Sequence, residues 1–166
     1  MMSAGWVRLA AVMGLLIGSF LTVVTERVPE GESIVAPGSR CGACGLRLGP
    51  LDLVPVFSWL FLRGRCRRCR TSIGIEPLVL ELGTASLFVA MTLRFEDSVE
   101  TVAFCVLAAG LLGLSWIDLR IKRLPREISY TTLALGAPLL VVAALVRDEP
   151  RRIWTMVLGA VLALAF

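Results

Sequence analysis

The 166-residue chain contains no histidine, and sixteen of its 17 basic residues are arginine. The absence of histidine excludes zinc sites of the Cys2His2 type, nucleophiles activated by an adjacent imidazole, and haem held by a histidine. Acid–base chemistry near neutral pH would therefore have to come from carboxylates, or from a cysteine, lysine or tyrosine with a perturbed pKa.

Apolar residues make up 57% of the chain, and the mean hydropathy is +0.81. Ordinary domains are about 45–50% apolar, and here the excess is concentrated in uninterrupted runs. Each run approaches the roughly 20 residues that a helix needs to cross about 30 Å of hydrocarbon. The sequence therefore predicts an all-α polytopic membrane protein, with spans at Trp6–Val24, Pro77–Leu93, Val99–Ile117 and Ile128–Val146.

A fifth apolar run, Ile153–Phe166, has only 14 residues. As a helix it would reach about 21 Å at 1.5 Å per residue, which is short of a full crossing. We therefore expect about five transmembrane helices, of which the last is incomplete, as in a truncated chain or a fragment. The first run lacks a small-x-small cleavage site, which favours a retained helix over a cleaved signal peptide.

Basic residues are concentrated in two connections between the runs. Residues 29–76 carry seven arginines, and residues 118–127 carry four basic side chains, whereas residues 94–100 are mainly acidic. By the positive-inside rule, the two basic segments lie in the cytoplasm and the N-terminus lies outside. The expected organisation is a first transmembrane helix over 1–28, a cytoplasmic cysteine-rich domain over 29–76 and a membrane domain over 77–166.

Four of the five cysteines form two Cys-x-x-Cys pairs, Cys41 with Cys44 and Cys66 with Cys69, separated by 21 residues. Each pair can present two thiolates to one tetrahedral ion, so the four together predict a structural zinc site with no open coordination position. A cytoplasmic location favours metal binding over structural disulfides. The alternatives are unrelated thiols or two separate redox pairs. Cys105 lies alone in the third run and is most simply a small core residue.

The segment between the two cysteine pairs, residues 51–65, is apolar enough to lie on a membrane surface or against neighbouring helices. Its Trp59 is suited to the membrane interface. Basic residues beside aromatic ones also occur in nucleic-acid binding. In a loop between membrane spans, contact with anionic lipid headgroups explains the arginines more simply, so we expect the bilayer and not nucleic acid as the partner.

Two carboxylates lie near the predicted cytoplasmic ends of the spans. Asp118 is at or just inside the end of the third run, where an ionised carboxylate is costly and is therefore a functional candidate. A water-exposed aspartate paired with Arg120 or Lys122 is an equally good interpretation. Glu81 lies one turn inside the second run, and it is interpreted as a partner for a cytoplasmic arginine or as a residue that reaches the interface.

Several stretches resemble the type IV prepilin peptidase family of bifunctional leader peptidases and N-methyltransferases. Residues 14–29 (GLLIGSFLTVVTERVP) are similar to the family's N-terminal GSFLNVVIYRLP stretch. Residues 39–73, with their cysteine spacing and DLVPVFSWLFLRGRCRRC, resemble the family's cysteine-rich domain almost word for word. The LELGTA stretch at 80–85 resembles VELLTA, and Asp118 in IDLRIKRLP matches the family's first catalytic aspartate.

The resemblance implies an aspartic endopeptidase of the bacterial inner membrane that removes the leader of prepilin-like precursors at the cytoplasmic face. One aspartate would activate water and a second would protonate the leaving group. The family also methylates the new N-terminus from S-adenosylmethionine. Its second aspartate sits in a Gly-x-Gly-Asp motif that is expected to fall beyond Phe166, so residues 77–166 would be an incomplete protease domain. Glu76-Pro77 departs from the family's more frequent Tyr-Pro, and no role is carried over there.

Two functions of other classes compete with the peptidase. A non-catalytic membrane scaffold, whose zinc domain binds a partner at the inner face, is compatible with a single catalytic aspartate. A membrane thiol oxidoreductase that uses the Cys-x-x-Cys pairs is disfavoured by the predicted orientation, because dithiol oxidases generally act on the outer face.

Overall fold

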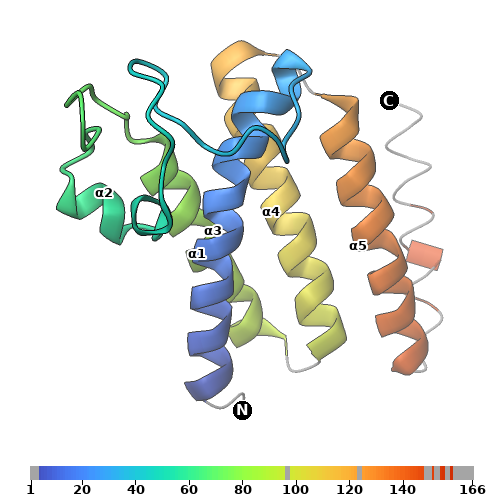
Figure 1. The fold of residues 1–166 in the computed structure, drawn as a ribbon. Helices are drawn as coiled ribbons and strands as arrows, with labels where there is room; N and C mark the ends of the chain where they lie inside the picture. The colour runs from blue at the N-terminus through green and yellow to red at the C-terminus, as the bar shows by residue number, and fades with distance from the viewer. Residues whose placement is uncertain are drawn as a thin grey trace.

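The computed structural model describes residues 4–95, 98–122 and 125–147, together with residues 151, 154, 155 and 158. Its four long helices are α1 (Ala4–Arg27), α3 (Glu76–Arg94), α4 (Ser98–Ile121) and α5 (Arg126–Val146). The connection between α1 and α3 contains three short helices, η1 (Val28–Glu30), η2 (Pro50–Leu53) and α2 (Phe57–Phe61). Within the described residues there are isolated β-bridges but no strand. The predicted all-α class is confirmed (Figure 1).

Among the described residues, four segments are long and apolar enough to cross a membrane: Ala4–Glu30, Glu76–Arg94, Val99–Ile121 and Arg126–Val146. They coincide with the four complete runs predicted from the sequence, with charged residues added at their ends. The predicted fifth span, 153–166, lies outside the described residues apart from residues 154, 155 and 158.

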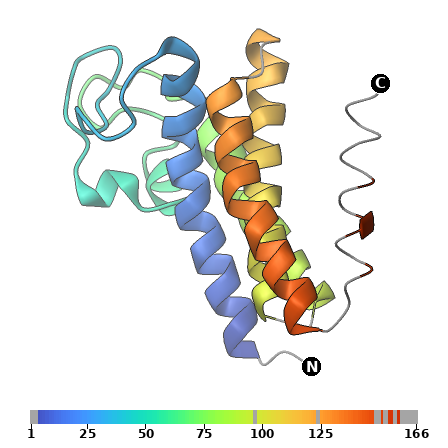
Figure 2. The same cartoon turned by 90° about the vertical axis from the view of Figure 1, so that its right-hand side faces the viewer.

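The four long helices form an antiparallel bundle in which the chain runs alternately up and down (Figures 1 and 2). The C-terminal ends of α1 and α4 therefore meet the N-terminal ends of α3 and α5 at one end of the bundle. The cysteine-containing connection, residues 29–75, lies beside α1 and α3 towards this same end. We call it the loop end.

Two glycines allow α1 and α3 to pack with their backbones in contact. A Cβ atom on Gly18 would lie 2.5 Å from the Cα of Glu81, and one on Gly14 would lie 2.5 Å from the Cα of Ala85. Both distances are too short for any side chain. Small residues four apart on one helix face are a general device for close helix packing in membranes, where apolar burial alone gives little driving force. The backbones of α1 and α3 are therefore in direct contact at these two positions.

The residues that the structure describes form two small apolar clusters inside the bundle. Leu21, Phe88, Cys105 and Ala109 form the one nearer the middle, and Val24, Ile117 and Ile128 form the one nearer the loop end. Burial of Cys105 in the first cluster agrees with its prediction as a small core residue. Many other large apolar side chains of the long helices point outwards, as expected for surfaces that meet lipid.

Candidate metal centre and loop-end carboxylates

The four predicted ligand cysteines come together in space. The Sγ atoms of Cys41 and Cys69 are 3.7 Å apart, those of Cys44 and Cys66 are 3.9 Å apart, and all four lie within 4.8 Å of one another. A tetrahedral zinc ion with Zn–S bonds of about 2.3 Å would hold its sulfurs about 3.8 Å apart. The four thiols are free and can therefore hold one metal ion, and the spacing suits zinc.

Each cysteine pair sits on a tight hairpin with the same hydrogen bonds. In the first hairpin, residues 39–48, the Cys41 N–H donates to the Leu46 carbonyl at 2.8 Å and the Gly45 N–H to the Cys41 carbonyl at 2.9 Å. In the second, residues 64–73, the Cys66 N–H donates to Thr71 at 2.9 Å and the Arg70 N–H to Cys66 at 3.0 Å. Both hairpins thus aim two sulfurs at one point from a short local turn.

The surroundings of the four thiols differ. Hydrogen bonds from the side chain and backbone of Thr71 lower the pKa of Cys69 to about 6. Backbone N–H groups of Cys69 and Arg68 likewise lower the pKa of Cys66. The Leu46 N–H lowers the pKa of Cys44, but burial and the three neighbouring thiols outweigh it and raise that pKa to about 11. The thiolates of Cys66 and Cys69 are therefore better stabilised than that of Cys44.

Two side chains between the hairpins hold the second one in place. Asp52 Oδ2 accepts hydrogen bonds from the Gly49 N–H and from the Arg67 guanidinium, both at 2.9 Å. Trp59 packs on Gly64 and donates its Nε1–H to the Gly74 carbonyl at 2.6 Å. The sequence suggested that Trp59 lies at the membrane interface, which stays a prediction; in the structure its indole is half-buried and joins the second hairpin to Gly74.

Glu81 joins the loop to the bundle. Its side chain is buried and accepts a hydrogen bond from the Val56 N–H at 2.6 Å, directly before α2. Val56 has a φ of 63° and a ψ of −51°, the conformation of a classic γ-turn, which is strained for a β-branched residue. Neither interpretation from the sequence, a partner for arginine or a residue reaching for the interface, describes this role. Glu81 instead satisfies a backbone N–H at the entrance to α2.

Glu76 is the centre of a polar cluster at the loop end. Its carboxylate accepts hydrogen bonds from Trp116 Nε1 at 2.8 Å and from Thr25 Oγ1 at 3.3 Å. It also forms an ion pair with Arg120, at 2.8 and 2.9 Å to its two oxygens. One carboxylate at the start of α3 thus holds the ends of both α1 and α4.

Asp118 lies on α4 between the two residues that Glu76 holds. At 100° per residue, a position two residues from both Trp116 and Arg120 lies on the opposite face of the helix. Asp118 is exposed there, and Arg120 pairs with Glu76 instead of with Asp118. The Glu76 cluster therefore sets the rotation of the last turn of α4 and with it the direction in which Asp118 points.

Comparison of the sequence with known proteins shows the family to which the chain belongs. The family model described as Bacterial Peptidase A24 N-terminal domain matches residues 12–95, half of the chain. A prepilin leader peptidase/N-methyltransferase of Myxococcus xanthus is 42% identical over 128 residues, which cover 77% of this chain and 38% of that protein. One from Pseudomonas putida is 35% identical over 155 residues, 80% of this chain and 54% of that protein. This chain belongs to the prepilin peptidase family.

A third member of the prepilin peptidase family, the type 4 prepilin-like proteins leader peptide-processing enzyme of Escherichia coli, is 34% identical over 169 residues. That alignment covers 91% of this chain and 61% of the relative. The chain thus spans about half the length of the curated relatives it matches. No solved structure matches it.

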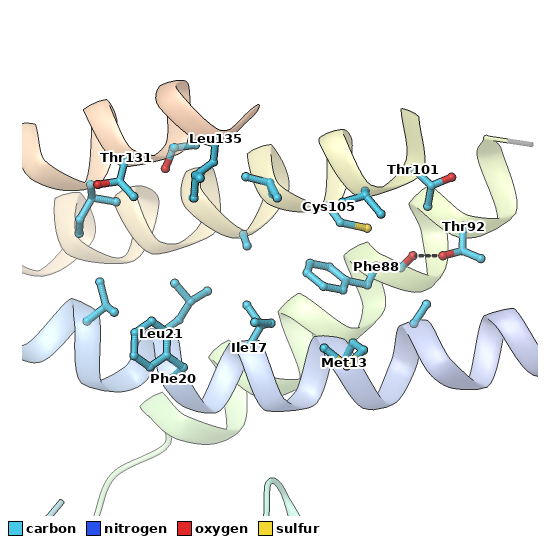
Figure 3. A pocket seen from close by; sticks show the side chains of 18 of the residues that line it. Met13, Ile17, Phe20, Leu21, Phe88, Thr92, Thr101, Cys105, Thr131 and Leu135 are labelled. Carbon is cyan, nitrogen blue, oxygen red and sulfur yellow. Dashed lines mark hydrogen bonds between the residues drawn. The ribbon is translucent and has the colours of Figure 1, made fainter. Parts of the chain in front are cut away.

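An apolar groove of about 630 Å³ runs along the bundle between α1 and α5, with α3 and α4 as its floor. Figure 3 shows Met13, Ile17 and Phe20 on one side, Leu135 on the other, and Phe88 between them. The Thr92 hydroxyl at its edge donates its hydrogen bond to the Phe88 carbonyl at 2.8 Å, so this donor is already used within α3. The groove suits an acyl chain or an apolar helix. It does not fit the charged groups of S-adenosylmethionine.

Sequence reasoning missed the role of Glu76 and of the two α1 glycines. The signal for the glycines was present, because Gly14 and Gly18 have the small-xxx-small spacing. Glu76 stood out only as a departure from the family. Its partners, Thr25 on α1 and Trp116 and Arg120 on α4, come from helices that no local pattern pairs with α3.

Proposed function

We propose that this chain acts in the removal of the leader peptide from type IV prepilin-like precursors, as an aspartic endopeptidase at the cytoplasmic face of the bacterial inner membrane. The observation that carries the proposal is Asp118, an exposed carboxylate at the loop end of a membrane helix, whose direction is set by the Glu76 cluster. Membership of the prepilin peptidase family supports the substrate class.

Peptide hydrolysis by carboxylates needs one group that takes a proton from the attacking water and another that gives a proton to the leaving amine. Asp118 supplies one of these two groups. Its exposed face of α4 points away from the Glu76–Arg120 ion pair, so the arginine does not compete for the carboxylate that water and substrate must reach. The second carboxylate is the family's Gly-x-Gly-Asp aspartate.

Zinc is assigned a structural role in residues 29–76, the domain between a first membrane helix over 1–28 and the membrane protease domain over 77–166. Cys41, Cys44, Cys66 and Cys69 would hold the ion, which joins the two hairpins and leaves no coordination position for water. The names of the relatives also suggest an N-methyltransferase activity. No step of that reaction is assigned to residues of this chain.

Cleavage of a prepilin in membranes tests the proposal directly. With protein expressed from its complete reading frame, Asp118→Asn should lower the cleavage rate by about 10²–10⁴-fold, as expected for the loss of an acid–base group. Glu127→Gln is the matched control, because Glu127 is an exposed carboxylate in the first turn of α5 at the same end of the bundle. Normal cleavage by Asp118→Asn would refute the role of Asp118.

The main competing function is a non-catalytic scaffold whose zinc domain binds a partner. The scaffold predicts that cells carrying Asp118→Asn keep the full pilus or secretion phenotype, whereas cells carrying Cys66→Ser lose it. If the wild-type protein yields no cleaved prepilin, the peptidase is excluded and the scaffold takes its place.

A further inference from the structure

The connection between the two hairpins carries a group of exposed apolar side chains that neither the metal centre nor the bundle uses. These are Leu51 on η2 and Phe57, Leu60 and Phe61 on α2, with Phe61 85% exposed. We call them the α2 patch. Contiguous exposed apolar groups of this kind mark a surface that meets lipid or another protein.

The α2 patch lies at the depth of the membrane-spanning helices. The Val56 N–H is bonded to Glu81, which is five residues inside the span that starts at Glu76, or about 7.5 Å along the helix axis. Both views show α2 below the hairpins, level with the middle part of α1 and lying across the bundle axis (Figures 1 and 2). At that depth the surroundings of an exposed side chain are acyl chains or other membrane segments, not water.

Arginines follow directly after α2. Among the described residues, the only ion pair of the second hairpin is that of Arg67 with Asp52, and no ion pair involves Arg63, Arg65, Arg68 or Arg70. Arg63 and Arg65 are exposed and lie within four residues of Phe61. A guanidinium group matches the geometry of a phosphate, and a basic segment beside an inserted apolar face is the pattern of attachment to anionic lipids.

We propose that η2 and α2 form an interfacial anchor for the cysteine-rich loop. The α2 patch inserts among the acyl chains of the leaflet on the loop side, and Arg63 and Arg65 bind the phosphates of anionic lipids in that leaflet. Glu81 fixes the depth of insertion through its bond to Val56, and the γ-turn at Val56 makes the sharp entry that lays α2 in the membrane plane. The metal centre is thereby held at a set height above the membrane.

Photocrosslinking of the full-length protein in lipid nanodiscs tests the anchor. Phe61→p-benzoylphenylalanine should give adducts with phospholipid, detected by mass spectrometry. The same probe at Val35, which is 84% exposed in the same loop but outside the α2 patch, should give none. In mixed phosphatidylglycerol and phosphatidylethanolamine, the phosphatidylglycerol preference of the Phe61 adduct should fall about fivefold when Arg63→Gln is introduced, and by a similar factor with Arg65→Gln.

Three results would overturn the proposal. These are a Phe61 adduct with protein, whether a second copy, another segment of the chain or an added prepilin; equal lipid labelling at Val35 and Phe61; and no lipid adduct at Phe61. Each probe variant must give the same limited-trypsin digestion pattern as the wild-type protein, which shows that the loop is still folded. If the Phe61 variant does not, Leu60→p-benzoylphenylalanine takes its place, because Leu60 lies on the same exposed surface.

Discussion

The two cysteine hairpins, residues 39–48 and 64–73, have the same backbone but different side chains. Three hydrogen bonds recur with a constant offset, as in Leu48 N–H to the Ser39 carbonyl and Ile73 N–H to the Gly64 carbonyl, at 2.9 and 2.8 Å. The left-handed position is Gly45 in the first and Arg70 in the second, with φ of 68° and 61°. The next residue is Leu46 in the first and Thr71 in the second.

The comparison of the two hairpins separates the features that metal binding requires from the side chains that can differ. The metal requires the backbone turn and the two sulfurs, and both hairpins supply them. An arginine in the left-handed conformation costs about 1–2 kcal/mol relative to a glycine, and the second hairpin tolerates it. That hairpin also has supports that the first lacks, namely Trp59 on Gly64 and Asp52 on Arg67.

Loss of one cysteine should have the largest effect, because it removes what the hairpins share. Cys66 is only 2% exposed, and Cys66→Ser should abolish stoichiometric zinc. Structural zinc supplies on the order of 10 kcal/mol of folding free energy in small domains. Trypsin should then cut in both hairpins, across residues 37–73, as it should after chelation of the wild-type protein. Metal analysis and limited proteolysis provide the measurement.

The matched control for that experiment is Cys105→Ala, which removes a buried thiol from α4 and should leave zinc and digestion unchanged. Cleavage confined to residues 64–73 in Cys66→Ser, with the first hairpin still protected, would mean that the hairpins fold independently. The shared metal site would then be wrong.

Trp59→Phe should affect only the second hairpin. The change keeps an aromatic ring near Gly64 but removes the hydrogen bond to the Gly74 carbonyl. Loss of such a bond costs about 0.5–1.5 kcal/mol. Hydrogen exchange should become faster in residues 64–74 and stay the same in residues 39–48. Equal acceleration in both hairpins would show that Trp59 supports the metal centre as a whole.

Features that depend on local spacing could be predicted from the sequence. The four complete membrane spans follow from run length, and the cysteine quartet follows from two Cys-x-x-Cys pairs whose sulfurs the structure brings within 4.8 Å. In both cases the information lies within one segment or in a short motif with fixed spacing. The catalytic role of Asp118 was inferred from the resemblance and stays a prediction.

Features that depend on which helix faces which could not be predicted. Glu76 has partners on α1 and α4, and its role appears only when three helices are placed together. Glu81 was located at the correct depth, but its bond to Val56 depends on the path of a loop that has no periodic pattern. Trp59 was predicted at the interface from its residue type, but its packing on Gly64, a glycine with positive φ five residues later, could not be predicted.

Exchange of the left-handed residues should change stability in opposite directions. Gly45→Ala should destabilise the first hairpin by about 1 kcal/mol, because a Cβ atom is unfavourable at its positive φ. Arg70→Gly should relieve the same strain in the second hairpin and stabilise it by somewhat less, because glycine is more flexible when unfolded. The chelator concentration that releases half of the zinc should fall for Gly45→Ala and rise for Arg70→Gly. Shifts of the same sign would contradict the equivalence of the two positions.

The smallest effect should come from the residue after the left-handed position. Thr71 lowers the pKa of Cys69 to about 6, whereas Cys44 beside Leu46 has a pKa raised to about 11. A ligand with a lowered pKa remains a thiolate to lower pH, so its contribution is present above that pKa and is lost as the pH falls through it. Thr71→Val should therefore raise the midpoint of acid-induced zinc release by roughly half a pH unit, the size expected for one hydrogen bond. Leu46→Thr should lower the midpoint if its hydroxyl reaches Cys44 as Thr71 reaches Cys69. Because the two hairpins share one backbone, a shift with Thr71→Val but none with Leu46→Thr would mean that burial of Cys44, and not the missing hydroxyl, sets the difference between them.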